Sequence, residues 1–246
     1  MLVGLHQRGI RPDLVLFADT GGEKPETYAY EAVMQRWLAS VGFPPVTTVK
    51  LGTVNGKLGT YSTLEENCLV NHTLPSLAFG YKSCSLKWKV APMDRFVEGW
   101  PPAIEAWTAG RKVTRAIGYD AGPKDAKRAW NIAEDDRYEY VYPLREWGWG
   151  RDRCAAEIEA AELPVPPKSA CFFCPATKPD ELAVLIDQHP ELADRIVALE
   201  ATAKPYLKTI DGLWRKPVTG LRGGTPRPGS MTEFIVEQRK RPSLAA

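Results

Sequence analysis

The stretch Pro12–Trp37, PDLVLFADTGGEKPETYAYEAVMQRW, decides the fold. Its compact apolar run, Leu14–Ala18, ends in the small polar residues Asp19–Gly22, which predicts a buried strand followed by a turn. Pro25 then suits the first turn of a helix. Apolar residues recur at helical spacing from there up to Trp37, which predicts that the helix continues to that residue. Strand, turn and helix make half of a parallel βα unit, and such sheets bind ligands at the carboxyl ends of their strands. We therefore predict a ligand-binding turn at Asp19–Gly22, although a helix start that binds nothing needs the same residues.

The rest of the chain alternates predicted strands and helices, which indicates an α/β fold with a mostly parallel sheet and helices on both faces. Strands are expected at 46–51, 112–118 and 138–144, and helices at 1–9, from 63, at 127–132, 152–163 and 180–203, the last one broken near His189–Pro190. Residues 52–59 and 74–83 are expected to be loops. The predicted organisation is an α/β domain at 1–150, a Cys-containing helical and loop subdomain at 151–208, and a Gly/Pro/Arg-rich tail at 209–246.

The composition is that of an ordinary globular protein. The chain has 246 residues, of which 44% are hydrophobic and 25% charged, and this balance argues against wholesale disorder. The net charge of +2 does not by itself indicate a nucleic-acid partner. No apolar run reaches membrane-spanning length and no signal-peptide pattern is present, so we expect a cytoplasmic protein without a membrane partner. The sequence gives no indication of an oligomeric state.

The five cysteines favour metal or redox chemistry, because an odd number in a reducing compartment argues against a disulfide framework. Cys171-x-x-Cys174 has the spacing at which two thiolates share one metal ion. Cys84 and Cys154 are the candidates that complete a set of four, and Cys68 is a weaker one. Four thiolates suit zinc and an iron–sulfur cluster equally well. The alternative is that these thiols are small buried side chains that only pack.

Basic residues provide a second set of candidates. Lys87 and Lys89 lie close to Cys84 and would suit a phosphate or sulfate group, although solvated surface charge is the default interpretation of any one lysine. Arginines of the predicted tail suit either a nucleic-acid substrate or a solubilising role. They are Arg222, Arg227, Arg239 and Arg241.

Three segments together resemble one known family. LFADTGGEKPETY resembles the D-T-G-x-E-x-P-E-T-Y segment of the phosphoadenosine phosphosulfate (PAPS) reductase-like family, which belongs to the adenine-nucleotide alpha-hydrolase, or PP-loop ATP pyrophosphatase, superfamily. KSCSLKWKVAP is similar to the family's C-[ST]-x-x-x-K-x-x-P segment. PLREWGWGRDRCAAEIEAAELPVPPKSACFFCP is similar to its PL-x-x-W…C…KS-x-C-x-x-CP ending. The likeness is greatest to the phage and bacterial branch.

The resemblance implies an enzyme that binds ATP or a related adenine nucleotide. It implies cleavage between the α and β phosphates to adenylylate a substrate, coupled to sulfur transfer. A further segment, Gly118 to Asp120 followed by Arg128, resembles the family's G-[IY]-x-x-[DE]…R turn. The residues implied to hold adenosine are Asp19, Thr20, Gly21, Gly22 and Gly118. Those implied to face phosphate, and hence the catalytic candidates, are Lys87, Lys89 and Arg128. Cysteines of this region hold a [4Fe–4S] cluster in the DNA-phosphorothioation sulfurtransferases, which implies that role for Cys84, Cys154, Cys171 and Cys174.

The chain departs from the family in two places. The family's S-x-G-G-K-D-S loop, which cradles the nucleotide phosphates, has no counterpart in this sequence, and we expect that loop and its central strand to be encoded upstream. The E-C-G-L-H nucleophile motif of true PAPS reductases is also missing, so thioredoxin-linked reduction of PAPS is not expected. A hypothesis from another class is a metal-stapled module that binds nucleic acid or a protein and has lost catalysis.

Overall fold

The computed structural model describes residues 1–75, 83–129, 134–221 and 224–240. The chain divides into two compact units, and each is described by itself. Unit 1 comprises residues 1–17, 26–48 and 93–168, and unit 2 comprises residues 18–25, 49–92 and 169–246. About half of the chain is helical and the rest includes short parallel strand pairs, so the predicted α/β class is confirmed. The predicted boundaries at 150 and 208 do not match this division, because the chain passes between the units several times.

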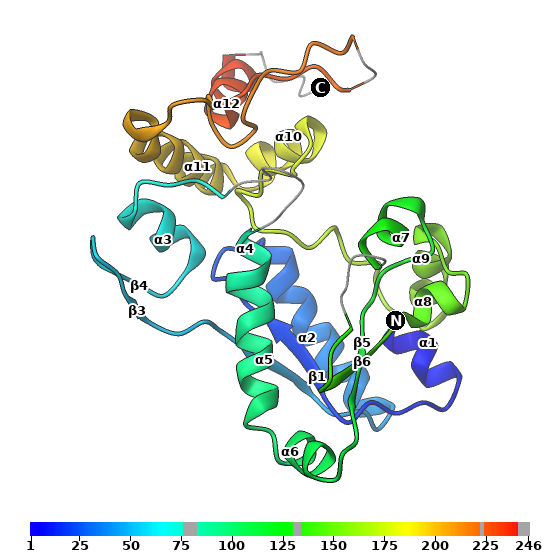
Figure 1. Ribbon diagram of the computed structural model, residues 1–246. Coiled ribbons are helices and arrows are strands. Elements are labelled where there is room, and N and C mark those ends of the chain that lie inside the picture. The colour runs from blue at the N-terminus through cyan, green and yellow to red at the C-terminus, as the bar shows by residue number, and fades with distance from the viewer. Residues whose placement is uncertain (76–82, 130–133, 222–223, 241–246) are drawn as a thin grey trace. The chain divides into compact units, whose positions relative to one another are not determined.

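Unit 1 carries two strand pairs and most of the helices of the first two thirds of the chain (Figure 1). Strand β1 (Val15–Ala18) lies beside β2 (Val46–Val49), and β5 (Val113–Ala116) is parallel to β6 (Tyr138–Val141). The helices are α1 (Leu2–Gln7), α2 (Pro25–Ser40), α5 (Ala91–Glu98), α6 (Pro101–Thr108), α7 (Pro123–Ala129), α8 (Pro143–Glu146) and α9 (Arg151–Ala160). The residues at 18, 25, 49, 91 and 92 that end these elements are assigned to unit 2.

The two strand pairs of unit 1 remain separate. Within the described ranges the strands form three two-stranded sheets, and no ladder of hydrogen bonds joins β1–β2 to β5–β6. Strand β5 is not covered as an interior strand would be. Thr114 and Ala116 are exposed, and Val113 and Arg115 are only half-buried. Interior strands of a parallel sheet are covered on both faces. The structure therefore shows parallel pairs where the sequence predicted one continuous sheet.

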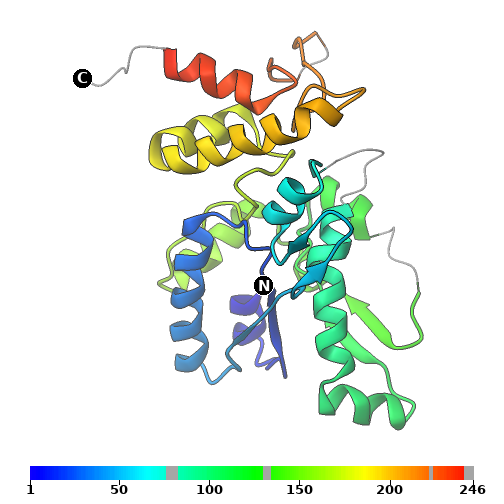
Figure 2. The ribbon, with the colours of Figure 1, turned by 90° about the vertical axis from the view of Figure 1, so that its left-hand side faces the viewer.

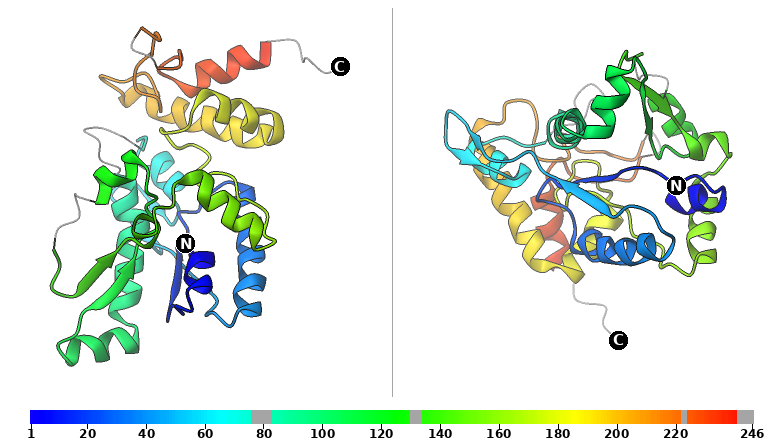
Figure 3. Two further views of the ribbon diagram at one scale, coloured as in Figure 1. Left: turned by 90° about the vertical axis from the view of Figure 1, so that its right-hand side faces the viewer. Right: turned by 90° about the horizontal axis from the view of Figure 1, so that it is seen from below.

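Unit 1 has two small hydrophobic clusters. In the first, Leu38 of α2 packs with Leu5 of α1 and with Phe43. In the second, Val97 of α5 packs with Ala103 of α6 and with Tyr138 of β6, and side chains of β1 and β5 lie against this group. Helix α1 also packs beside α9, as Figure 3 shows. Strands and helices of this unit are thus joined through apolar side chains on short elements.

Unit 2 is mainly helical. Its strands β3 (Val54–Asn55) and β4 (Thr60–Tyr61) form an antiparallel hairpin. The helices are α3 (Leu64–Val70), α4 (Ser83–Ser85), the π-helix η2 (Leu86–Val90), α10 (Pro179–Gln188), α11 (Pro190–Ala203), the 3₁₀ turn η3 (Lys204–Tyr206) and α12 (Met231–Lys240). Helices α10, α11 and α12 lie side by side (Figure 2), and α3 packs against α11. The break between α10 and α11 falls at His189–Pro190, as predicted.

The core of unit 2 is the largest of the molecule's hydrophobic clusters. Phe172 and Phe173, the two residues between the cysteines of the C-x-x-C motif, are at its centre with exposed fractions of 1% and 0%. Burying a phenylalanine side chain contributes roughly 2–3 kcal/mol. Burial of the two phenylalanine rings therefore anchors the C-x-x-C motif in the core of unit 2. Trp88 of η2 and Ile196 of α11 belong to the same cluster.

Much of the predicted Gly/Pro/Arg-rich tail at 209–246 is ordered by its contacts with the core of unit 2. Leu213, Trp214, Met231 and Ile235 are buried in the core of unit 2, and α12 is a regular helix. The apolar residues at 231, 234 and 235 follow helical spacing. The prediction used the composition of the whole segment, in which Gly, Pro and Arg outweigh these three residues. The predicted nucleic-acid contacts Arg222 and Arg241 lie outside the described residues.

Other boundaries shift for local reasons. The strand predicted at 138–144 ends at Val141, because Pro143 begins α8. The helix predicted at 127–132 begins earlier, at Pro123, and residues 130–133 lie outside the described part. The loop predicted at 52–59 contains β3, and helix α6 was not predicted. Most of the loop predicted at 74–83 also lies outside the described part. None of the helices in the described residues is long and apolar enough to cross a membrane.

Glu200 of α11 fixes the C-terminal segment to the core of unit 2. It is 4% exposed. Its Oε1 accepts hydrogen bonds from the backbone N–H groups of Leu213 (2.6 Å) and Met231 (3.0 Å). Its Oε2 accepts from the N–H of Thr232 (2.8 Å) and from the hydroxyl of Ser230. One carboxylate thereby satisfies the first N–H groups of α12, which have no partner within the helix.

We predict that Glu200→Ala lowers the free energy of unfolding by about 2–4 kcal/mol, because it leaves buried N–H donors without an acceptor. Urea unfolding of the full chain measures the effect. Glu237→Ala, on the exposed face of α12, is the matched control and is expected to change stability by less than about 0.5 kcal/mol. Equal effects of the two substitutions would contradict the role given to Glu200.

Candidate functional site

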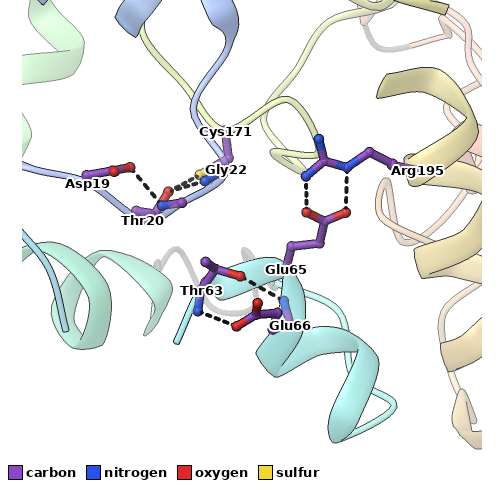
Figure 4. Close-up of polar contacts among 9 residues, drawn as sticks. Asp19, Thr20, Gly22, Thr63, Glu65, Glu66, Cys171 and Arg195 are labelled. Atoms are coloured by element: carbon purple, nitrogen blue, oxygen red, sulfur yellow. Dashed lines mark hydrogen bonds and ion pairs between the residues drawn. The ribbon is translucent and has the colours of Figure 1, made fainter. Parts of the chain in front are cut away.

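The turn after β1 is built by its own side chains. Asp19 is buried, and its Oδ1 accepts a hydrogen bond from the N–H of Gly21 at 2.8 Å. The hydroxyl oxygen of Thr20 accepts from the N–H of Gly22 at 3.3 Å (Figure 4). Gly21 has φ +73°, which glycine adopts without strain. The residues predicted to bind a ligand thus form a compact turn with local hydrogen bonds.

Both glycines of the turn are required by its packing. A Cβ on Gly21 would lie 2.4 Å from the Cγ2 of Thr63, and a Cβ on Gly22 would lie 2.7 Å from the ring of Phe173. Gly118, predicted from the resemblance to approach the same ligand, lies in unit 1. Its Cβ would meet only the sulfur of Met1, at an ordinary 3.9 Å. The structure therefore gives a packing reason for Gly21 and Gly22 but none for Gly118.

The C-x-x-C loop docks directly on this turn, although the two are 148 residues apart. Glu23 and Cys171 form an antiparallel backbone bridge, and the N–H of Phe172 donates to the carbonyl of Gly22 at 2.9 Å. The Cys171 sulfur and the Thr20 hydroxyl are hydrogen-bonded at 3.1 Å (Figure 4). The N–H of Cys174 then donates to the carbonyl of Cys171 at 3.0 Å, which closes a tight turn. Two predicted sites, one for a nucleotide and one for a metal, are adjacent in unit 2.

A buried ion pair lies beside these two segments. The side chain of Glu23 is 0% exposed, and its Oε1 lies 2.7 Å from the Nζ of Lys89, whose side chain is 33% exposed. Burial alone lowers the pKa of Lys89, but the charge of Glu23 and the hydrogen bond to it outweigh burial and leave that pKa raised. Lys89 is therefore a fixed cation at the turn. Sequence reasoning missed Glu23 as a site residue, although a carboxylate inside a strand–helix turn was a usable signal.

The thiol of Cys171 is held in its protonated form. Burial and the neighbouring carboxylate of Glu23 raise its pKa to about 12, against the opposing effects of the Thr20 hydrogen bond and Lys89. Cys68 is more deeply buried, and burial raises the pKa of its thiol to about 12 as well. The thiolate is the nucleophile and metal-binding form of cysteine. These surroundings favour the neutral thiol at both positions.

Lys50 supplies a second cation. Its Nζ lies 3.0 Å from the Oδ2 of Asp19, and its side chain is 64% exposed, so the charge is accessible to solvent. Lys50 was not predicted as a site residue. It directly follows β2, whose carboxyl end is at the same edge as Asp19 because the N–H of Asp19 donates to the carbonyl of Val49 at 2.9 Å. Because ligands bind at the carboxyl ends of parallel strands, the position of Lys50 directly after a predicted strand was a usable signal.

Lys87 and Arg128 have other partners. Lys87 is on η2, where Trp88 points into the core; its Nζ donates to the hydroxyl of Tyr61 at 3.0 Å. Arg128 lies on α7 in unit 1, pairs with Asp125 at 2.9 Å and covers the ring of Tyr119. Of the three catalytic candidates, Lys89 is the one with a hydrogen bond to Glu23, the residue directly after the turn. π-helical turns are rare and frequently occur at functional sites.

The described residues do not fit the predicted four-thiolate site as they stand. Cys154 is on α9 in unit 1, whereas Cys84, Cys171 and Cys174 belong to unit 2 together with Cys68. The sulfur of Cys171 faces a hydroxyl and a carboxylate, and nowhere in the described ranges do three or more His, Cys, Asp or Glu side chains form a group placed to hold a metal ion. The zinc or [4Fe–4S] assignment stays a prediction.

Comparison with known proteins identifies no relative. No protein-family model matches the chain, and neither the curated proteins nor the solved structures contain a significant match. The likeness to the PAPS reductase-like family therefore rests on the quoted segments of the sequence alone.

We predict that Gly22→Ala lowers the free energy of unfolding by about 1–3 kcal/mol, because the added methyl group collides with the ring of Phe173. Gly99→Ala is the matched control, since a Cβ at Gly99 would meet only the carbonyl oxygen of Phe96, at an ordinary 3.8 Å. Thermal unfolding of both variants compares them. A control that loses as much stability as Gly22→Ala would show that Phe173 does not limit the space at this turn.

We also predict that the Lys89–Glu23 pair loses its stabilising effect at high pH. The pKa of Lys89 is raised in the folded chain, so the contribution is fully present below the ordinary value of 10.5 and is lost as pH rises through the higher folded-state value. The difference in unfolding free energy between the wild type and Lys89→Met should shrink above that pH. The same difference for Lys57→Met, at an exposed loop position, should stay near zero throughout.

Proposed function

We propose that the protein is an adenine-nucleotide-binding enzyme of the PAPS reductase-like type, with an adenine-nucleotide alpha-hydrolase-like fold. It cleaves ATP between the α and β phosphates, adenylylates an acceptor and couples this step to sulfur transfer. The adenosine end of the nucleotide binds at the turn Asp19–Gly22. Lys89 and Lys50 provide the positive charge that the phosphates require.

One observation carries this proposal. The three segments on which the resemblance rests are far apart in sequence, and one residue of each takes part in a single partly buried cluster: Glu23, Lys89 and Cys171. A turn that only starts a helix needs local hydrogen bonds, but it needs neither a lysine nor a thiol from distant segments. The convergence supports a common ligand for the three segments.

The chemistry suits a reaction in which negative charge develops on phosphate. Attack of an acceptor oxygen or sulfur on the α phosphorus forms the new ester bond, and pyrophosphate leaves with the electron pair of the broken P–O bond. Fixed cations stabilise the charge of the transition state without reorganisation. Lys89 suits this role because Glu23 holds it in one position, whereas exposed lysines must first be ordered.

The alternative, a metal-stapled module that binds nucleic acid or a protein and has lost catalysis, predicts a different result in the same assays. It predicts no binding of ATP at the turn and no release of pyrophosphate. The sulfate-assimilation reaction would instead give thioredoxin-dependent sulfite release, which we do not expect.

Isothermal titration calorimetry with ATP tests the proposal. We expect saturable binding that Lys89→Met weakens about tenfold or more, since a charge-assisted hydrogen bond contributes about 1.5–3 kcal/mol. Lys57→Met is the matched control and should bind ATP as the wild type does. A wild-type protein that binds no adenine nucleotide and releases no pyrophosphate would contradict the proposed function.

A further inference from the structure

Glu23 has one carboxylate oxygen that accepts no hydrogen bond from the described residues. Its Oε1 accepts from Lys89, and the Thr20 hydroxyl and the Cys171 sulfur lie 3.5 and 3.9 Å from the same atom. The other oxygen, Oε2, is buried and finds no partner among the described residues. A buried carboxylate oxygen without a donor destabilises the folded chain, because it has lost its hydrogen bonds to water. An atom of this kind at a turn predicted to bind a ligand is a candidate acceptor for a hydrogen bond from that ligand.

The surroundings restrict the chemistry of that donor. Lys89 already neutralises the charge of Glu23, so a second cation at Oε2 would leave excess positive charge in a buried position. Phosphate oxygens at neutral pH only accept hydrogen bonds and would be repelled by the carboxylate. A neutral O–H or N–H group is therefore the partner that fits. In a nucleotide such groups belong to the nucleoside: the exocyclic amine of adenine and the hydroxyls of ribose.

We propose that Glu23 is a specificity-determining residue, whose Oε2 accepts a hydrogen bond from the nucleoside part of the bound nucleotide while Lys89 holds Oε1. This inference rests on the proposed function and deepens it. It also places the nucleoside at Oε2 of Glu23, while Lys89 at the other oxygen stays the group that the proposed function gives to phosphate. Asp19 does not compete for the position, since its two oxygens bond Gly21 and Lys50.

A set of nucleotide analogues tests the proposal with the wild-type chain. ITP replaces the adenine amine with a carbonyl, and 2′-deoxy-ATP and 3′-deoxy-ATP each lack one ribose hydroxyl. We expect one of these three to bind at least tenfold more weakly than ATP, because a hydrogen bond to a charged group is lost. Which analogue is weakened identifies the donor. Binding of all three within threefold of ATP would overturn the proposal.

Glu23→Gln sharpens the test. The ammonium group of Lys89 can only donate hydrogen bonds, so it bonds the oxygen of the side-chain amide in the Glu23→Gln variant. The amide NH₂ then takes the position of Oε2, where it donates a hydrogen bond and accepts none. If the adenine amine is the partner, this variant should prefer ITP over ATP, which reverses the wild-type order. If a ribose hydroxyl is the partner, the discrimination against the deoxy analogue should fall to less than threefold. Glu237→Gln, on the exposed face of α12, should keep the wild-type preference.

The outcomes separate this inference from the proposed function. Binding of ATP without discrimination among the analogues overturns the role of Glu23 and leaves nucleotide binding in place. Failure of the wild type to bind any of the four nucleotides overturns both. If Glu23→Gln does not fold, the analogue series with the wild-type chain decides alone.

Discussion

The docking of the C-x-x-C loop on the Asp19–Glu23 turn is the interaction on which the candidate site depends. The backbone bridge between Glu23 and Cys171 sets the register of the two segments, and the rings of Phe172 and Phe173 anchor the loop in the core of unit 2. A side chain larger than hydrogen at Gly22 has no room against the ring of Phe173. Apolar burial thus supplies the free energy, and main-chain hydrogen bonds supply the geometry.

Docking brings Glu23 into a buried position, and this creates the need for Lys89. A carboxylate removed from water is costly unless a cation or hydrogen-bond donors compensate for it. Lys89 satisfies one oxygen from η2, and the π-helical turn places Trp88 in the core between two lysines that point to different partners. The second oxygen of Glu23 remains unpaired in the described part of the chain. A turn that only begins a helix does not need a buried carboxylate paired with a lysine from a distant segment.

The sequence predicted the elements of this protein better than their assembly. Hydrophobic periodicity found β1, α2, β2, β5, β6 and α9, and proline placed the break between α10 and α11. These signals are local, because strand and helix patterns depend on neighbouring residues. The region after residue 209 was missed for the opposite reason: its stability comes from the carboxylate of Glu200 and from contacts of Trp214 and Met231 with other helices. Average composition does not record such contacts.

By itself, the sequence determined the α/β class, the turn at Asp19–Gly22 and the chemical kinds of the candidate residues. Only the tertiary structure decided which of them meet. It brought Cys171 to Thr20 and Glu23, gave Lys89 rather than Lys87 to the turn, and assigned Cys154 to a different unit from the other cysteines. The physical reason is that hydrogen bonds and ion pairs act over about 3 Å, whereas these residues are separated by tens to more than a hundred positions along the chain. Spacing in the sequence determines which residues are neighbours within one helix or strand. Packing of the core determines which residues of different segments come into contact.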